Sequence, residues 1–324
     1  MPNFWTSLPK PFLALAPMEG ITDFVFREII AEIAKPDVFF TEFTNTDGLF
    51  STGRDLVIQN LSFTEKQRSI VAQIWGANPK SFFKAAQLIS ELKFDGIDLN
   101  MGCPDKSIVN KKAGAALIKN PNLTQELIKA TREGAGNLAV SVKTRIGFDK
   151  NIMQEWITFL LEQNLDALTI HGRTGKMRFK GQASWEDIGN AVLIRNEVSP
   201  KTIIIGNGDI KSYKEALEKH KNCQVDGVMI GRGILANPWI FNKTTEPVTH
   251  TKKEHLEILL RHMKKHRDKW GTTRNFAPIK KFIKMYVNNF PGAPDLRNKL
   301  MQCREHTQAE RLVTQALSST LEHS

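Results

Sequence analysis

Eight short apolar runs, rich in β-branched residues, recur along the first three quarters of the chain and limit its possible folds more than any other feature. They occupy Phe12–Met18, Val38–Phe43, Ser69–Trp75, Gly96–Cys103, Val140–Ile146, Ala167–Arg173, Thr202–Asp209 and Gly227–Gly233. Their starts lie about 25 to 45 residues apart, which leaves room for one strand, one helix and two loops. Because each run is almost continuously apolar, it is typical of a parallel strand that is buried on both faces.

Amphipathic stretches fill most of the intervals between these runs. They are Thr22–Ala34, Pro79–Leu92, Leu123–Glu133, Asn151–Gln163, Ser184–Val198 and Ser212–His220. The alternation of strand and helix predicts an α/β protein whose parallel sheet is covered by helices. Eight such units favour a closed (β/α)₈ barrel, the TIM barrel, over an open doubly wound sheet.

Two parts of the chain depart from this alternation. Residues Asn45–Ser69 show little helical periodicity, and we expect a long functional loop there. Past Phe241 the strand pattern stops, and Lys243–His250 is typical of a linker. The remainder predicts a small helical bundle, with helices over Lys252–Trp270, Asn275–Asn289 and from Pro294 to about Leu317. We therefore divide the chain into a barrel, residues 1–242, and a helical domain, residues 243–324.

The composition is that of an ordinary globular protein with a large core, since 41% of the 324 residues are hydrophobic and 24% are charged. No apolar run approaches the roughly 18 residues of a membrane span. The first residues lack the charged stretch and apolar segment of a secretory signal. The three cysteines are widely spaced, so we expect neither a disulfide framework nor a metal site. We expect a reduced, cytoplasmic, monomeric protein that does not enter a membrane.

The net charge of +11 is concentrated near the C-terminus. Residues 1–242 hold 29 basic and 26 acidic side chains, whereas residues 243–324 hold 16 basic and 8 acidic ones. A nearly neutral barrel followed by a basic helical segment suggests that a polyanion docks on the helices. The alternative is that these lysines simply cover solvated helix faces.

Polar residues follow nearly every predicted strand. In a parallel barrel the carboxyl ends of all strands open onto one mouth, where active sites lie. The residues that the predicted strands bring to this mouth are Pro17, Met18, Glu19, Glu42, Gln73, Asn100, Cys103, Lys143, Arg145, His171, Arg173, Asn207, Gly208, Asp209, Gly231 and Arg232. Because the strand interiors are apolar, this placement indicates a binding site.

The last two strands end in glycine-rich turns that suit a phosphate. Gly208 and Gly231 allow backbone amides to approach a ligand closely, and Arg232 adds a guanidinium. Glycines that serve only the geometry of two tight turns are the alternative. An ammonium group at Lys143 suits the N1–O2 edge of a flavin, and Gln73 offers a donor and an acceptor to a pyrimidine edge. We expect FMN rather than FAD, because no GxGxxG sequence is present.

Cys103 directly follows the fourth strand, and its thiol is a candidate acid. An unperturbed thiol has a pKa of about 8.5 and keeps its proton near neutral pH. The alternative is a small buried apolar residue, which is how we interpret Cys223 and Cys303. His171 either bonds the flavin or the substrate, or is satisfied by neighbouring groups at the mouth.

The strings that carry these residues resemble the bacterial tRNA-dihydrouridine synthases. They are, in the family's order, Ala16–Asp23 with Phe26-Arg27, Asp98–Pro104, Val142–Gly147, His171–Thr174, Asn207–Asp209 and Gly231–Gly233 with Asn237–Trp239. The resemblance covers about residues 12–240. The basic helical segment matches the family's tRNA-binding domain in position and character.

The resemblance implies roles for most of the residues at the mouth. The isoalloxazine of FMN would lie along the backbone of Pro17, Met18 and Glu19. Its pyrimidine ring would bond Gln73 and Lys143, and His171 would sit beside it. The phosphate end would be held by Asn207, Gly208, Asp209, Gly231 and Arg232. On the substrate side, Asn100 would orient a uracil, Cys103 would donate a proton, and Arg145 and Arg173 would complete the site.

The implied reaction is reduction of the C5–C6 double bond of particular uridines in tRNA. NADPH or NADH would reduce FMN, hydride would pass to C6, and Cys103 would protonate C5. The tRNA phosphates would meet basic side chains of the helical segment, namely Lys252, Lys253, Arg261, Lys264, Lys265, Arg267, Lys280, Lys281 and Lys284.

Several features leave room for other interpretations. Met177 and Phe179 stand where many family members carry Gln and Tyr, and Asp105-Lys106-Ser107 departs from the family's usual loop. Both departures bear on the choice of uridine rather than on the flavin. One rival function is an FMN barrel that acts on a free pyrimidine or an enone. Another is a tRNA-binding protein without catalytic activity.

Overall fold

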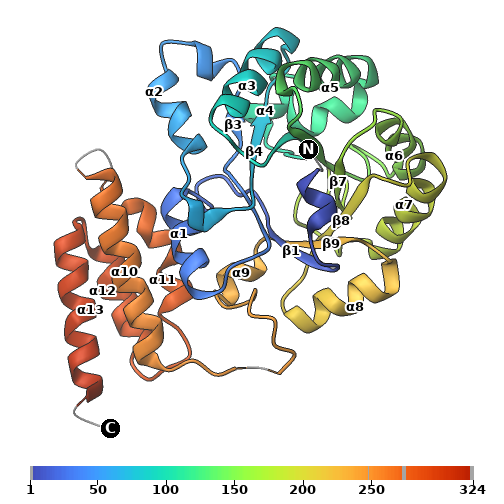
Figure 1. The fold of residues 1–324 in the computed structure, drawn as a ribbon. Coiled ribbons are helices and arrows are strands. Elements are labelled where there is room, and N and C mark those ends of the chain that lie inside the picture. Colours follow the sequence, from blue (N-terminus) through green and yellow to red (C-terminus); the bar gives the residue numbers. More distant parts are fainter. Residues whose placement is uncertain (1–2, 247, 272–274, 322–324) are drawn as a thin grey trace.

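The computed structural model describes residues 3–246, 248–271 and 275–321, and it confirms the barrel (Figure 1). All strand pairs are parallel. The strands are β1 (Phe12–Leu15), β2 (Val38–Phe40), β3 (Thr44–Asn45), β4 (Ile70–Trp75), β5 (Gly96–Met101), β6 (Ala139–Arg145), β7 (Ala167–His171), β8 (Ile203–Asn207) and β9 (Gly227–Ile230). They run in the order β2-β1-β9-β8-β7-β6-β5-β4-β3, and the pairing of β2 with β4 closes the sheet.

The second unit is the least regular, as its sequence suggests. β2 and β3 both pair with β4, so together they fill one of eight places in the barrel. The segment after β3 is not a plain loop, because it folds into η2 (Gly48–Phe50), α2 (Arg54–Val57), η3 (Ile58–Leu61) and η4 (Glu65–Gln67). Each of these turns is too short to produce a visible helical period. The buried Arg27 holds the segment by donating to Gln67 Oε1 (2.9 Å) and to the Ser62 carbonyl (2.6 Å).

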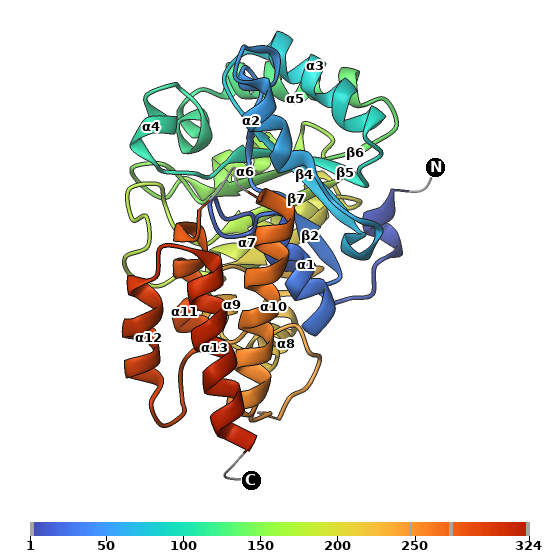
Figure 2. The same ribbon diagram turned by 90° about the vertical axis from the view of Figure 1, so that its left-hand side faces the viewer.

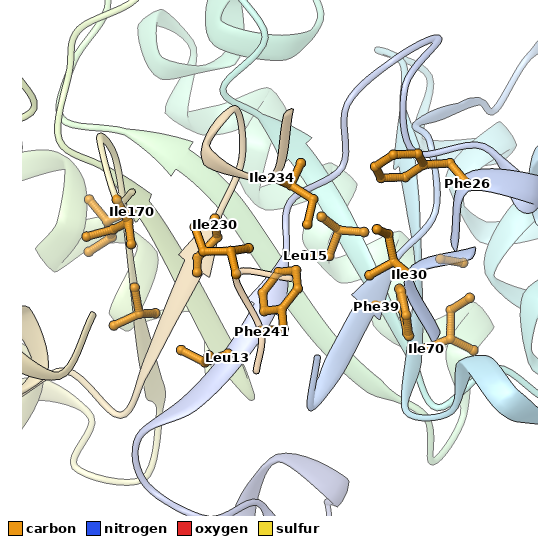
Figure 3. Packing of buried hydrophobic residues seen from close by; sticks show 14 of the residues in the cluster. Leu13, Leu15, Phe26, Ile30, Phe39, Ile70, Ile170, Ile230, Ile234 and Phe241 are labelled. Carbon is orange, nitrogen blue, oxygen red and sulfur yellow. The ribbon is translucent and has the colours of Figure 1, made fainter. Parts of the chain in front are cut away.

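Helices cover the outside of the barrel at the predicted places. They are α1 (Phe24–Ile33), α3 (Pro79–Glu91), α5 (Pro121–Ala135), α6 (Met153–Leu161), α7 (Trp185–Val198) and α8 (Tyr213–Cys223). Several begin at Asx or Ser caps, such as Asp23 and Ser212, whose side chains accept from backbone amides in the first turn. One large apolar cluster fills the layer between strands and helices. Figure 3 shows part of it, with residues of α1 beside those of β1 and β2.

Short elements that the sequence does not reveal complete the barrel. They are η1 (Phe4–Ser7), α4 (Lys106–Val109), η5 (Gly114–Lys119) and α9 (Gly233–Ala236). Alternate residues of each strand point into the barrel, and a second apolar cluster fills its lower half. Trp5 of η1 packs there against Phe12 and Phe40, with ring centroids 5.8 and 6.2 Å apart. The barrel interior is therefore filled by side chains at its base, and the space for a ligand lies at the mouth.

The C-terminal segment is helical, as predicted, and packs beside α1 (Figure 2). It comprises α10 (Lys252–Trp270), η6 (Ala277–Ile279), α11 (Lys280–Tyr286), α12 (Ala293–Gln302) and α13 (His306–Leu321). A capping box between Thr251 and Glu254 begins α10. The single helix predicted over Asn275–Asn289 is wrong in detail, because η6, which contains Pro278, precedes α11.

The helical segment shares the apolar core of the barrel. Phe26 of α1 stacks on Phe282 of α11, with ring centroids 5.0 Å apart. Glu32 of α1 pairs with Lys265 (3.0 Å) and Arg261 (3.5 Å) of α10. None of the helices in the described parts of the chain is both long and apolar enough to cross a membrane. The functional division at residue 242 remains a prediction.

Candidate active site

A pocket of about 970 Å³ opens at the carboxyl ends of the strands. Its lining includes every site residue selected from the sequence: Pro17, Met18, Glu19, Gln73, Asn100, Cys103, Lys143, Arg145, His171, Arg173, Asn207, Gly208, Asp209, Gly231 and Arg232. Their individual roles remain predictions. Glu42, which the sequence also brings to the mouth, lies outside the lining and supports a loop beneath it.

The backbone of Cys103 is fixed on both sides. Its N–H donates to Asn100 Oδ1 (3.0 Å), and its carbonyl accepts from the Ala115 N–H (2.9 Å). Asp105 then caps α4 by accepting from the Ser107 N–H (2.9 Å). Burial raises the pKa of the Cys103 thiol above its ordinary value, so the thiol keeps its proton at neutral pH. The site thus holds a protonated thiol on a turn that hydrogen bonds fix on both sides.

Lys143 supplies a partly buried positive charge. Its Nζ donates to Asn207 Oδ1 (3.0 Å), while Asn207 Nδ2 donates to the Met229 carbonyl (2.8 Å). Burial, and then the nearby Arg145 guanidinium, lower the pKa of Lys143 to about 8. The ammonium is therefore present at neutral pH, and it is close to losing its proton.

The amide side chains of Gln73 and Asn100 link β4 to β5 at the floor of the pocket. Gln73 Nε2 donates to Asp98 Oδ2 (2.7 Å), and Gln73 Oε1 accepts from Asn100 Nδ2 (3.0 Å). Asn100 Oδ1 also accepts from the Gly102 N–H (3.1 Å). Asn100 therefore uses both ends of its amide within the chain, in addition to lining the pocket where we expect the uracil.

The two arginines expected on the substrate side also act as clamps. Arg145 donates to the carbonyls of Gly102 (2.6 Å), Thr174 (3.0 Å) and Arg178 (3.0 Å). Arg173 donates to the carbonyls of Lys180 and Gly181 and to Asp209. Both side chains are almost fully buried, so their first effect is to hold three mouth loops together.

His171 is neutral in this setting. Arg173 Nη1 lies 3.2 Å from His171 Nε2, and a guanidinium can only donate. Nε2 must therefore accept, and the ring proton belongs on Nδ1. Burial, together with the nearby Lys143 and Arg145 charges, lowers the pKa of His171 far below its ordinary value. The side chain is thus suited to hydrogen bonding rather than to proton donation as an imidazolium.

The ends of β8 and β9 combine open backbone with positive charge. Gly208 and Asp209 have φ values of +139° and +55°, and a Cβ added to Gly231 would approach no atom closer than 3.7 Å. Asp209 pairs with Arg173 (2.6 Å) and Arg232 (3.5 Å). Partial burial raises the pKa of Asp209, but the Ala183 N–H and Arg173 outweigh it and lower the pKa overall. Asp209 therefore orients the guanidinium groups.

The loop after β1 is held from two directions. The Gly20 N–H donates to Glu42 Oε1 (2.5 Å), and the Gly20 carbonyl accepts from Lys281 Nζ of α11 (3.1 Å). Burial raises the pKa of Glu19, and Lys281 lowers it by a smaller amount. Burial and the Asp23 charge raise the pKa of Glu42 to about 7. A residue of the helical segment thus supports a loop of the pocket.

Sequence reasoning missed several lining residues, among them Phe43, Trp75, Arg178 and Lys211, whereas it had singled out Phe179, which also lines the pocket, as bearing on the choice of uridine. Phe179 is 61% exposed, and the Arg232 guanidinium lies 5.0 Å from its ring centroid. Trp75 ends β4, and its position as a strand-terminal aromatic could have identified it. Within the described residues, no group of three or more His, Cys, Asp or Glu side chains is placed to hold a metal ion.

A parallel barrel with a thiol and several cations at its mouth defines this chain as a barrel enzyme. Its fold is similar to that of morphinone reductase, with a TM-score of 0.51, 14% identity, and coverage of 75% of this chain and 89% of that one. It is also similar to a 2-naphthoyl-CoA reductase, with a TM-score of 0.56, 11% identity, and coverage of 72% and 49%. At these identities the likeness concerns the fold alone.

Sequence comparison identifies the family. The dihydrouridine synthase (Dus) family model matches residues 14–322. A probable tRNA-dihydrouridine synthase 2 of Bacillus subtilis is 42% identical over 315 residues, which cover 96% of this chain and 95% of that protein. A probable tRNA-dihydrouridine synthase of Staphylococcus aureus is 42% identical over 317 residues, with coverage of 96% and 94%. The chain belongs to the dihydrouridine synthase family and is a flavin-dependent oxidoreductase.

Proposed function

We propose that this enzyme reduces uridine to 5,6-dihydrouridine in tRNA, with FMN as its cofactor and NADPH or NADH as its reductant. The observation that carries the proposal is that one pocket holds both the Lys143 ammonium and the protonated thiol of Cys103. A volume of about 970 Å³ lies at the upper end of the range of cofactor pockets and suits a flavin with a base beside it.

The residues present fit FMN chemically. Lys143 has N–H donors besides the one used on Asn207, and it would face the N1–O2 edge of the isoalloxazine, which becomes anionic when the flavin is reduced. Arg232, half exposed, and the backbone of Gly208 and Gly231, which both line the pocket, would hold the phosphate. Reduced FMN, when bound, supplies the hydride that the C6 carbon of uracil accepts.

Cys103 would deliver the proton that completes the reduction. Hydride addition at C6 leaves negative charge spread over C5, C4 and O4, and proton transfer from the thiol to C5 completes the new C–H bond. The raised pKa of the thiol keeps this proton available. The bonds from Asn100 and Ala115 to the Cys103 backbone hold the thiol in place while the base enters.

A tRNA partner requires a base to leave its stack, at a cost of a few kcal/mol. Basic side chains would offset this cost through phosphate contacts. The structure narrows the set expected from the sequence, since Arg261, Lys265 and Arg267 form ion pairs with Glu32 or Glu310. Lys264 and Lys284 are exposed and form no ion pair in the described parts of the chain, which leaves them the better candidates.

Replacement of Cys103 by Ala tests the proposed chemistry. We expect the variant to bind FMN and to be reduced by NADPH as the wild type is, because neither step uses the thiol. Dihydrouridine formation on unmodified tRNA by the prereduced variant is expected to fall by about 10² to 10⁴, the usual contribution of a general acid. Single-turnover mass spectrometry of the tRNA measures this rate. Unimpaired formation would remove Cys103 from the mechanism.

A further inference from the structure

A carboxylate without access to solvent lies directly beneath the pocket. Asp98 is on β5, two residues before Asn100, so both side chains point into the barrel. Its Oδ1 accepts from Ser141 Oγ (2.7 Å), and its Oδ2 accepts from Gln73 Nε2 (2.7 Å). Asp98 does not line the pocket itself. Any effect that it has on the site must therefore pass through its partners.

The bonds that begin at Asp98 form a chain with a fixed direction. Gln73 Nε2 donates to Asp98, and Gln73 Oε1 accepts from Asn100 Nδ2 (3.0 Å). Asn100 consequently turns its own oxygen toward the N–H groups of Gly102 and Cys103 (3.1 and 3.0 Å). If either amide rotated by 180°, two donors or two acceptors would face each other at each of its bonds.

The geometry points to Asp98 as the positioning residue that fixes the orientation of the Gln73 and Asn100 amides and thereby places Cys103. An acceptor at the Asp98 position leaves Gln73 only one favourable orientation, and each later link follows from the one before it. The inference rests on the proposed function insofar as it assigns Gln73 to the flavin and Cys103 to proton donation.

Ionisation of Asp98 supports this account. Burial raises its pKa to about 6, although the bonds from Ser141 and Gln73 act in the opposite direction. The carboxylate is therefore charged at neutral pH and can only accept hydrogen bonds. Its charge is also near Lys143, each favouring ionisation of the other. The test must separate this charge effect from the effect of orientation.

The chain offers variants that separate them. Asp98→Leu removes the acceptor altogether. Asp98→Asn removes the charge but can still present its oxygen to Gln73, because its nitrogen can donate to Ser141. The Ser141 hydroxyl can then turn toward the Ile97 carbonyl, 3.3 Å away. Ser141→Ala alone leaves the carboxylate able to accept from Gln73. The double variant Asp98→Asn/Ser141→Ala lacks the Ser141 hydroxyl, which would otherwise fix the orientation of the introduced amide.

Two measurements report on the two ends of the chain of bonds. The dissociation constant of FMN reports on Gln73. The iodoacetamide alkylation rate of Cys103 in the cofactor-free protein, followed on its peptide by mass spectrometry, reports on the cysteine turn. We expect each single variant, Asp98→Asn and Ser141→Ala, to stay within about twofold of wild type. We expect Asp98→Leu and the double variant to weaken FMN binding by about tenfold and to change the alkylation rate severalfold.

Two outcomes would overturn the inference. If Asp98→Asn is impaired as much as Asp98→Leu, the charge of Asp98 matters and its orienting effect does not. If the double variant shows only the sum of its two single effects, no orientation is being fixed. Should Asp98→Leu fail to fold, the other three variants still decide. Failure of the wild type to bind FMN would count against the proposed function, while the alkylation measurement would still test Asp98.

Discussion

At the level of single residues, burial shifts the pKa values of several pocket side chains in favour of their uncharged forms. It raises the pKa of the Cys103 thiol and lowers that of Lys143 to about 8. It also keeps His171 neutral between its cationic neighbours. The pocket therefore contains one proton donor and one ammonium whose proton is easily lost, which suits a site that binds an anion and protonates carbon.

The pH dependence of FMN affinity follows from Lys143. An anionic ligand binds to the protonated amine, so affinity is constant well below pH 8 and falls as the pH rises past about 8, by up to about tenfold per unit. Isothermal titration between pH 6.5 and 9.5 measures this. Lys143→Arg keeps its charge throughout this range. We therefore expect its FMN affinity to be weaker than that of the wild type but not to decline above pH 8. A decline of equal size in both proteins would assign it to another group.

Residue types at strand ends were predictable, but their partners were not. The positions of Lys143, Cys103 and Arg232 follow from strand periodicity and from the convergence of parallel strands at one mouth. The use of Arg145 and Arg173 as loop clamps depends on carbonyls that lie 29 to 43 and 7 to 8 residues away in sequence. A sequence pattern does not specify which carbonyl a guanidinium reaches.

At the level of elements, a hydrogen bond joins α11 to a loop of the pocket. Lys281 Nζ donates to the Gly20 carbonyl, and Gly20 follows the three residues expected to lie along the flavin. From the sequence we expected Lys281 to contact tRNA phosphate. In the structure its exposed side chain donates to this loop of the barrel, because α11 packs beside α1 through Phe282 and Phe26. Its contact with tRNA phosphate stays a prediction.

Replacement of Lys281 by Met separates these two uses. Loss of one hydrogen bond to the loop is worth about 1 kcal/mol, so we expect FMN affinity to fall by about fivefold and the salt dependence of tRNA binding to stay unchanged. Lys280→Met is the matched control, since Lys280 bonds the Met301 carbonyl within the helical segment. Normal FMN affinity with weaker, less salt-dependent tRNA binding would return Lys281 to the phosphate contacts.

At the level of the whole molecule, several basic side chains of the helical segment are already engaged in ion pairs, and the segment is packed on the barrel. Glu32 pairs with Arg261 and Lys265, and Glu310 pairs with Arg267. An apolar core continues from the barrel into the helices. Removal of residues 243–324 would expose that core, so a truncated barrel is a poor test of tRNA binding. Substitution of Lys264 and Lys284, which form no ion pair with any described residue, is a cleaner one.

The fold was largely predictable because eight buried strands with helices between them have few possible arrangements. The division of the second unit and the turns within residues 45–69 were not, since segments of three or four residues carry no period. The role of Asp98 was hidden for a different reason. A charged residue inside an apolar strand was visible, but its bonds to Ser141 and Gln73 require the closed barrel.

Incubation of the purified protein with FMN, NADPH and unmodified tRNA, in competition with free uridine, tests the central claim most directly. Mass spectrometry then measures dihydrouridine in each pool. The account predicts a yellow protein that converts uridine within tRNA at one or a few positions and leaves free uridine unchanged. A protein that does not bind FMN and forms no dihydrouridine would contradict it. So would a protein that reduces free uridine as readily as uridine within tRNA.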